Sequence, residues 1–168
     1  MLDYVVYRVV IGTPSGFGLA YDADMATPSL PQVPCYLLQR GDEQIVLHLA
    51  SMGLACCALE FNAATLDLPA QIRRLDPAEV PPQALHVFVV AGTLTDAMAP
   101  DITAAYDALA EPKAVMSFGA CSNSGGPYWD SYVVTQGLDR LMPVDVFVPG
   151  CPPRPEAFVD AAWTLAAQ

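Results

Sequence analysis

Four of the five cysteines in this 168-residue chain lie in glycine- or proline-containing segments and could act together as metal ligands. Cys56 and Cys57 are adjacent within Met52-Gly-Leu-Ala-Cys-Cys-Ala-Leu-Glu60. Cys121 follows Gly119 and precedes Gly125-Gly126, and Cys151 lies in Pro149-Gly-Cys-Pro-Pro153. Four thiolates from three loops can hold a metal centre, and an iron–sulfur cluster suits them best. The cysteines therefore predict a protein that moves electrons.

Zinc is an alternative metal, but the spacing of the cysteines disfavours it. Structural zinc sites favour cysteine pairs a few residues apart, which wrap the ion locally. A tandem pair with two distant single cysteines lacks this pattern, and the only histidines, His48 and His86, lie in apolar runs where structural roles are expected. The cysteines could also be small core residues, but the flanking glycines and prolines argue against that. We expect one 4Fe–4S cluster.

The tandem pair places a demand on the backbone. Adjacent side chains point to opposite faces of a strand and diverge by about a quarter turn around a helix. We therefore expect the backbone at Cys56-Cys57 to leave regular geometry, just before a helix over Ala58–Leu66. The N-terminus of that helix would stabilise the negative charge of a cluster.

Three short apolar runs, each closed by a turn former, predict buried strands: His86–Ala91, Ala114–Phe118 and Val144–Val148. A helix is expected between the first two, capped by Thr95 or Asp96, with Pro100 in its first turn and Ile102, Tyr106 and Leu109 at helical spacing. This order predicts an α/β fold with a flavodoxin-like parallel sheet flanked by helices. Ligands of such sheets bind beyond the carboxyl ends of the strands, and Cys121 and Cys151 each follow a predicted strand by three residues.

The remaining segments are described by simpler patterns. A closing helix is expected over Pro155–Ala167, with Phe158, Ala161, Ala162 and Leu165 on one face. The N-terminal part predicts a strand over Tyr4–Ile11, a loop over Thr13–Pro34 and an additional hairpin over Tyr36–Leu49. Pro69–Pro82 reads as irregular, and Cys35 as a buried structural thiol.

Composition narrows the function. The chain is 54% hydrophobic, with a mean hydropathy of +0.35, which fits either a surface covered by partner subunits or a buried parallel sheet. A net charge of −11 argues against nucleic acid. Without a G-x-G-x-x-G motif or a P-loop, the chain is not expected to bind NADH or flavin itself. No signal peptide or membrane-spanning run is apparent.

At these residues the chain resembles the small iron–sulfur subunit, or B subunit, of respiratory complex I, NADH:quinone oxidoreductase. The matching motifs cover about half the chain: Gly53–Glu60, Val90–Pro100, Gly119–Gly126 and Pro143–Glu156. Related small subunits of membrane-bound nickel–iron hydrogenases carry Cys-x-x-Cys in place of the tandem pair, so Cys56-Cys57 favours complex I. On this basis residues 1–168 form a single iron–sulfur domain, with a divergent N-terminal segment (1–50) and a cluster-binding core (51–168).

The resemblance implies that Cys56, Cys57, Cys121 and Cys151 bind the terminal 4Fe–4S cluster. That cluster passes electrons to quinone at the interface with a large hydrogenase-like subunit. Glu60 matches an acidic residue near the cluster, which implies either proton coupling or a surface or helix-capping role. A ferredoxin-like iron–sulfur subunit and membrane subunits are the other implied partners, on the cytoplasmic side of the membrane.

The chain also departs from the family pattern. Asp42–Ser51 replaces an amphipathic stretch that helps line the quinone channel, Phe61 replaces a methionine, and Pro77–Gln83 replaces a Ser-Pro-Arg-Gln turn. Two alternatives stay open: the small subunit of a nickel–iron hydrogenase-related complex, and a structural paralogue that retains the cluster.

Overall fold

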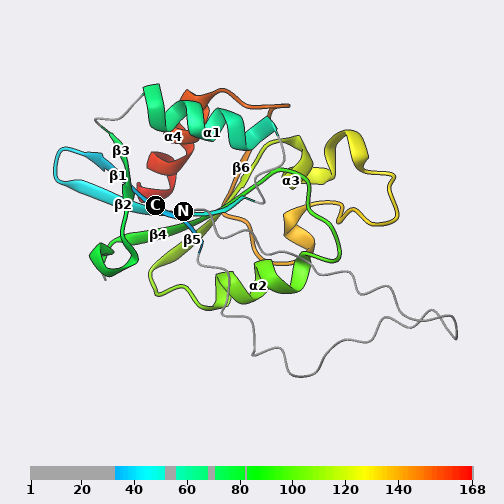
Figure 1. Ribbon diagram of the computed structural model, residues 1–168, viewed down its shortest axis with the longest axis horizontal. Coiled ribbons are helices and arrows are strands. Elements are labelled where there is room, and N and C mark those ends of the chain that lie inside the picture. Colours follow the sequence, from blue (N-terminus) through cyan, green and yellow to red (C-terminus); the bar gives the residue numbers. More distant parts are fainter. Residues whose placement is uncertain (1–32, 52–55, 68–70, 82, 168) are drawn as a thin grey trace, which may run out of the picture.

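A six-stranded mixed sheet forms the centre of the computed structural model, which describes residues 33–51, 56–67, 71–81 and 83–167 (Figure 1). Its strands are β1 (Cys35–Arg40), β2 (Glu43–Ser51), β3 (Ile72–Leu75), β4 (Leu85–Ala91), β5 (Lys113–Phe118) and β6 (Val146–Val148), in the order β3-β1-β2-β4-β5-β6. Strands β2, β4, β5 and β6 run parallel, whereas β1 is antiparallel to both β2 and β3. The predicted α/β class is confirmed.

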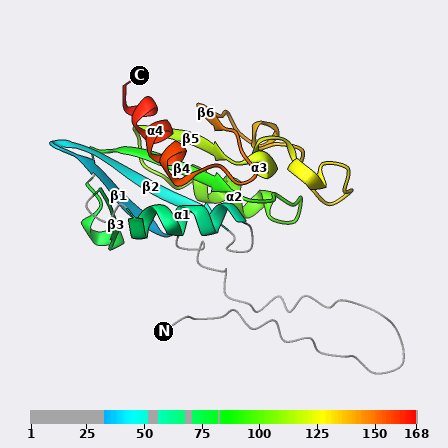
Figure 2. The ribbon, with the colours of Figure 1, turned by 90° about the horizontal axis from the view of Figure 1, so that it is seen from above.

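Helices cover both faces of the sheet. Figures 1 and 2 show α1 (Cys56–Asp67) and α4 (Pro155–Ala166) on one face, and α2 (Ala99–Asp107) on the other. The short helix α3 (Ala120–Ser124) directly follows β5. The larger core cluster lies under α1 and α4, where Phe61 and Phe158 are fully buried, and a second cluster lies under α2 around Phe88 and Ile102.

The predicted hairpin is present and belongs to the sheet itself. β1 pairs with β2 over Cys35–Arg40 and Glu43–His48, and β2 also pairs in parallel with β4 from Ile45 to Ser51. β2 is therefore an interior strand, and residues 50 and 51 both lie within it. Its central residues Ile45–Leu49 are all buried, as expected of a strand with neighbours on both sides.

The connections reverse direction between β2 and β4. β2 is followed by α1 and then by β3, which lies at one edge of the sheet. β4 is followed by α2 and then by β5, which lies on the opposite side of β4 from β2. Such a reversal is the place where open α/β sheets bind ligands, beyond the carboxyl ends of their strands. The fold thus points to the edge at which β2, β4, β5 and β6 end.

Most elements predicted for the second half are confirmed, including the buried face of α4. Away from the cysteines, two expectations were wrong. Pro69–Pro82 contains edge strand β3 and a 3₁₀ turn, Pro77–Glu79. Helix α2 is capped by neither Thr95 nor Asp96, because its N-cap is Met98 and the Asp96 carboxylate instead accepts a hydrogen bond from Thr135 Oγ1 at 2.7 Å.

Two further expectations, the strand over Tyr4–Ile11 and nearly all of the loop over Thr13–Pro34, lie outside the described residues. Within the described ranges, no helix has both the length and the apolar character needed to cross a membrane.

Candidate metal centre

The segments that carry the four cysteines follow strands that end at the same level of the sheet. Ser51, Ala91, Phe118 and Val148 are partners of one another across β2, β4, β5 and β6, so these strands end in the same row. Cys56 follows the end of β2 by five residues, and Cys121 and Cys151 follow β5 and β6 by three. Parallel strands thus bring all three segments to one edge of the sheet (Figure 1).

The tandem pair lies inside a helix, which corrects the expectation that it would leave regular geometry. Helix α1 begins at Cys56, so both cysteines occupy its first turn. Successive helical side chains diverge by about 100°. Cys57 accordingly turns inward and is buried, while Cys56 is exposed. The divergence that seemed to require a kink is met by placing one thiol in the core and the other at the surface.

Gly119 packs directly against the sulfur of Cys57. A Cβ atom built at Gly119 would collide with Cys57 Sγ and would also lie 3.5 Å from Pro153 Cδ and 3.7 Å from the Gly150 carbonyl oxygen. The φ of Gly119 is +95°, a conformation that other residues rarely adopt. The turn after β5 is therefore close to both the tandem pair and the segment around Cys151.

Backbone hydrogen bonds tie the Cys121 and Cys151 segments to each other. Gly119 N–H donates to the Val148 carbonyl at 2.9 Å, and Ala120 N–H donates to the Gly150 carbonyl at 2.7 Å. These bonds continue the pairing of β5 and β6 beyond the end of the sheet. Cys121 is buried and Cys151 is exposed, so each segment contributes one thiol to the same edge.

The electrostatics of Cys57 report the proximity of the other three thiols. The pKa of the Cys57 thiol is raised to about 12, mainly by burial and to a smaller extent by the nearby Cys56, Cys121 and Cys151. A thiolate at this position is costly in the absence of a positive partner. In the described ranges, no three His, Cys, Asp or Glu side chains approach closely enough to share a single metal ion.

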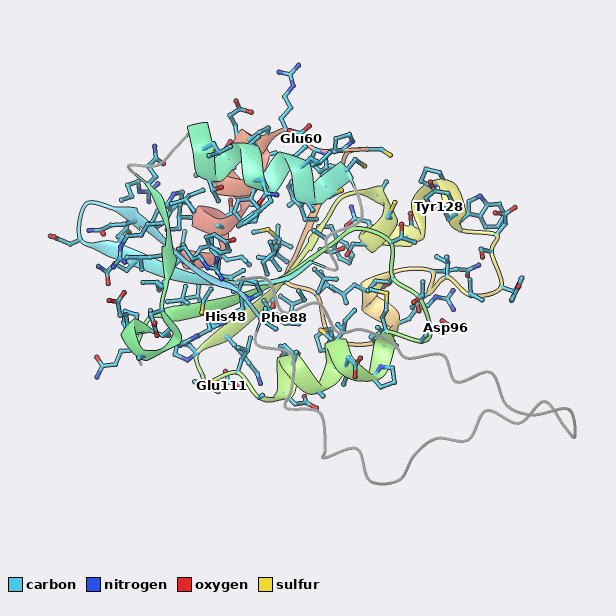
Figure 3. All side chains as sticks on the ribbon, viewed as in Figure 1. His48, Glu60, Phe88, Asp96, Glu111 and Tyr128 are labelled. Atoms are coloured by element: carbon cyan, nitrogen blue, oxygen red, sulfur yellow. The ribbon has the colours of Figure 1, made fainter. Side chains whose placement is uncertain are left out.

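Large apolar side chains are exposed on the elements that carry the cysteines or lead to them. Leu59 on α1 is 70% exposed, and Phe147 on β6 is 46% exposed. The loop beyond α3 adds Tyr128, Trp129, Tyr132 and Val133, which we call the aromatic loop. Figure 3 shows Tyr128 on this loop and Glu60 on α1. Glu60 is half-buried and lies one helical turn beyond Cys56.

Sequence reasoning missed a buried polar chain beside Cys121. It consists of Ser117, Ser122 and Asn123, and both serines are fully buried. The only signal in the sequence was a serine within the otherwise apolar run Ala114–Phe118. The two histidines are likewise buried, and His48 Nε2 lies 2.9 Å from His86 Nδ1 on the neighbouring strand.

Comparison with known proteins identifies relatives of the chain. The family model described as "NADH ubiquinone oxidoreductase, 20 Kd subunit" matches residues 54–165. A B subunit of the NADH-quinone oxidoreductase of Salinispora tropica is 48% identical over 142 residues, which cover 84% of this chain and 76% of that protein. A B subunit of the corresponding oxidoreductase of Streptomyces griseus is 54% identical over 120 residues, or 71% of this chain and 51% of that protein.

A solved structure extends the comparison to the fold. A chain of the membrane-bound sulfane sulfur reductase, an archaeal respiratory membrane complex, is similar with a TM-score of 0.55 and 27% identity. The match covers 72% of this chain and 67% of that one. Because the family model spans well over half of the chain and the matched region contains all four cysteines of the site, the chain belongs to the family of the 20 kDa subunit of NADH ubiquinone oxidoreductase.

Proposed function

We propose that this chain is the electron-transfer subunit of a complex I-like NADH:quinone oxidoreductase. Cys56, Cys57, Cys121 and Cys151 bind one 4Fe–4S cluster, which is the last carrier before quinone. The observation that carries the proposal is the arrival of three cysteine-bearing segments at one row of strand ends, with Gly119 against the Cys57 sulfur.

The residues present fit a 4Fe–4S cluster better than a single ion. The donor set is four thiols, which is the ligand set of such clusters. A cluster is larger than one ion, so its ligands are more widely spaced. The other three thiols are near enough to affect the pKa of Cys57. In the described ranges, however, the side chains are not as close together as the ligands of a single ion. Among the described residues, no positive charge contributes to the pKa of the buried Cys57 thiol, and ligated iron would supply one.

The chain's own residues bind the group and control its surroundings. A bound 4Fe–4S cluster supplies a one-electron carrier. The buried thiols of Cys57 and Cys121 would hold it from the inside, and the exposed thiols of Cys56 and Cys151 would hold it from the side open to a partner. The Cys57 thiol keeps its proton at neutral pH, so loading of the site releases that proton. Half-buried Glu60, one helical turn beyond Cys56, is the residue of α1 that we assign to proton coupling.

The partners follow from the exposed side of the site. An electron carrier needs its donor and acceptor close by, and the elements that carry the cysteines or lead to them also expose Leu59, Phe147 and the aromatic loop. Apolar groups gathered at one side of a protein mark an interaction surface. We assign this side to a large hydrogenase-like subunit that holds quinone at the interface. The electron donor is a ferredoxin-like iron–sulfur subunit, and membrane subunits hold the assembly at the cytoplasmic face.

Cysteine-to-serine variants of the intact complex test the proposal. The Cys57→Ser and Cys121→Ser complexes should lose one 4Fe–4S signal in electron paramagnetic resonance spectra and reduce quinone at least about a hundredfold more slowly, since a ligand is lost. Cys35→Ser is the matched control, because Cys35 is also buried but lies in β1, among Leu37, Val46 and Leu75. It should retain both the signal and the activity. Equal loss in all three variants, or loss in none, would refute the proposal.

One observation favours a second acceptor. The structural neighbour belongs to a complex named as a sulfane sulfur reductase. In this chain the stretch that departs from the family's quinone-lining element forms β2, whose central residues are buried in the sheet. A sulfur compound is thus the alternative acceptor. Steady-state assays of the purified complex with a quinone and with polysulfide distinguish the two acceptors.

A further inference from the structure

Three side chains beside Cys121 form a continuous hydrogen-bonded chain between three elements. Ser117 Oγ, on β5, lies 2.8 Å from Ser122 Oγ, on α3, and 2.6 Å from Asn123 Oδ1. Asn123 Nδ2 donates to the carbonyl oxygen of Val148, at the end of β6, at 3.1 Å. This series of hydrogen bonds thus runs from Ser122 on α3 to Ser117 on β5, then to Asn123 on α3, and ends at Val148 on β6.

The direction of every hydrogen bond in this chain is determined. The Val148 carbonyl can only accept, so the Asn123 amide must turn its NH₂ group towards it and its oxygen towards Ser117. Ser117 must then donate its single hydroxyl proton to Asn123 Oδ1. Ser122 is left as the donor to Ser117. Bonds that point the same way polarise one another, so the chain is cooperative.

Packing alone does not account for these residues. Ser117 and Ser122 have no exposed surface, and a buried hydroxyl costs free energy unless its hydrogen bonds are made. Alanine would fill either site without that cost. The chain instead links the residue next to Cys121 to the strand end three residues before Cys151. The Val148 carbonyl oxygen accepts hydrogen bonds both from the Gly119 backbone N–H and from the Asn123 side chain.

We propose that Ser117, Ser122 and Asn123 are positioning residues that fix the separation of Cys121 and Cys151. This inference rests on the proposed function, because the separation matters for a cluster that both thiols bind. Groups behind the ligands of a metal site typically change its affinity by about 10- to 100-fold when they are lost. The three side chains act in that way, through the ligand-bearing backbone and without contact to substrate.

Two variants of the intact complex test the inference. Ser117→Ala removes the central hydroxyl. Asn123→Leu removes the bridge to Val148 at a half-buried position, and it keeps the test available if Ser117→Ala fails to assemble. In both, loss of the cluster to a chelator should be about tenfold faster than in the unaltered complex. The g-values and the midpoint potential of the cluster should also shift.

Two controls separate positioning from general weakening. Thr135→Val removes another buried hydroxyl, which donates to Asp96 Oδ1 at 2.7 Å outside the Cys121 and Cys151 segments. Ser124→Ala removes an exposed hydroxyl from α3 itself. Both should keep the spectrum and a rate of cluster loss within about twofold of the unaltered complex. If Ser117→Ala and Asn123→Leu behave like Thr135→Val, the inference is wrong.

A second readout separates this inference from the proposed function. Cys121 is 5% exposed, so its alkylation in the chelator-stripped complex measures how well the segment is held. Cys121 should be alkylated about tenfold faster in Ser117→Ala and Asn123→Leu than in Thr135→Val, because the loss of one or two hydrogen bonds corresponds to a factor of that size. If Cys121→Ser removes no cluster signal, the proposed function is wrong, whatever the alkylation rates show. Equal alkylation rates in all variants would defeat the positioning role alone.

Discussion

At the residue scale, the site depends on the contact between Gly119 and the sulfur of Cys57. The hydrogen atom of glycine leaves room for that sulfur, and its φ of +95° turns the chain from β5 into α3. Neither property is available to another residue. The requirement for glycine here is therefore both steric and conformational, and both parts serve the placement of a thiol.

The variant Gly119→Ala tests this contact. The added methyl group meets Cys57 Sγ, so the sulfur or the turn must move, and the backbone is strained by about 1 kcal/mol or more. We expect a complex that assembles poorly or holds less than half of the iron and sulfide of the unaltered one. Gly41→Ala is the control, since Gly41 also has a positive φ but has open space around it. Equal iron content in the two variants would contradict the steric argument.

His48 (Figure 3) and His86 form the second residue-scale feature, on β2 and β4, the two neighbouring strands at the middle of the sheet order. Burial, and then the charge of His86, lower the pKa of His48 to about 4, and burial also lowers the pKa of His86. Unfolded histidines bind protons near pH 6.5. The folded pair therefore contributes stability that is present above pH 6.5 and is lost as the pH falls towards 4.

Replacing both histidines should flatten this pH dependence. In His48→Leu/His86→Leu, the stability between pH 6.5 and 4 should fall less steeply than in the unaltered chain, because two groups that bind protons only on unfolding are gone. Urea unfolding at a series of pH values gives the slope. Identical slopes would show that the pair does not titrate as described.

At the element scale, one aromatic side chain connects the helices to the sheet. Phe158 of α4 is fully buried and makes edge-to-face contacts with Phe61 of α1 and Phe118 of β5. The distances between ring centroids are 5.0 Å and 5.5 Å, respectively. α1 carries the tandem cysteines, and β5 leads to Cys121. The packing of α4 thus helps to set how the segments that carry Cys56-Cys57 and Cys121 face each other.

Phe158→Ala should destabilise the chain by about 3–5 kcal/mol, because it removes both ring contacts and leaves a cavity. Phe158→Leu keeps most of the volume and should cost much less. Chemical denaturation of the two variants gives the comparison. A loss below about 1 kcal/mol for Phe158→Ala would mean that α4 is not held by this contact.

The elements also show what the sequence can predict. β4 and β5 were predictable because each is a continuous apolar run that ends in a turn. β3 was missed because Ile72 and Leu75 are its only apolar residues and an edge strand tolerates Arg73 and Arg74. The helical start at Cys56 was missed because the divergence of adjacent side chains seemed an obstacle, whereas here one thiol turns inward and the other outward.

At the scale of the whole molecule, the apolar residues near the exposed thiols suggest an interface. The mean hydropathy of the sequence allowed either covered surfaces or a buried sheet. The structure shows that the interior strands β2 and β4 are buried, and it also leaves the aromatic loop exposed, with Tyr132 94% exposed. The position of this loop could not be predicted, since it depends on how α3 leaves the sheet.

Variants of the aromatic loop test the interface. Trp129→Ala and Tyr132→Ala should leave the fold of the chain intact, because both side chains are exposed, but should weaken its affinity for the large partner about tenfold or more. Leu66→Ala is the control: Leu66 is 78% exposed and lies at the other end of α1 from the cysteines. Co-purification of the large subunit gives the result. Equal retention in all three variants would place the interface elsewhere.

A cryo-electron microscopy map of the anaerobically purified complex would show whether the four thiols from three segments bind one cluster. We expect a single compact density with Cys56, Cys57, Cys121 and Cys151 at iron–sulfur bonding distance. A map in which any of these four sulfurs lies away from that density, or in which no such density is present beyond the ends of β2, β5 and β6, would contradict it.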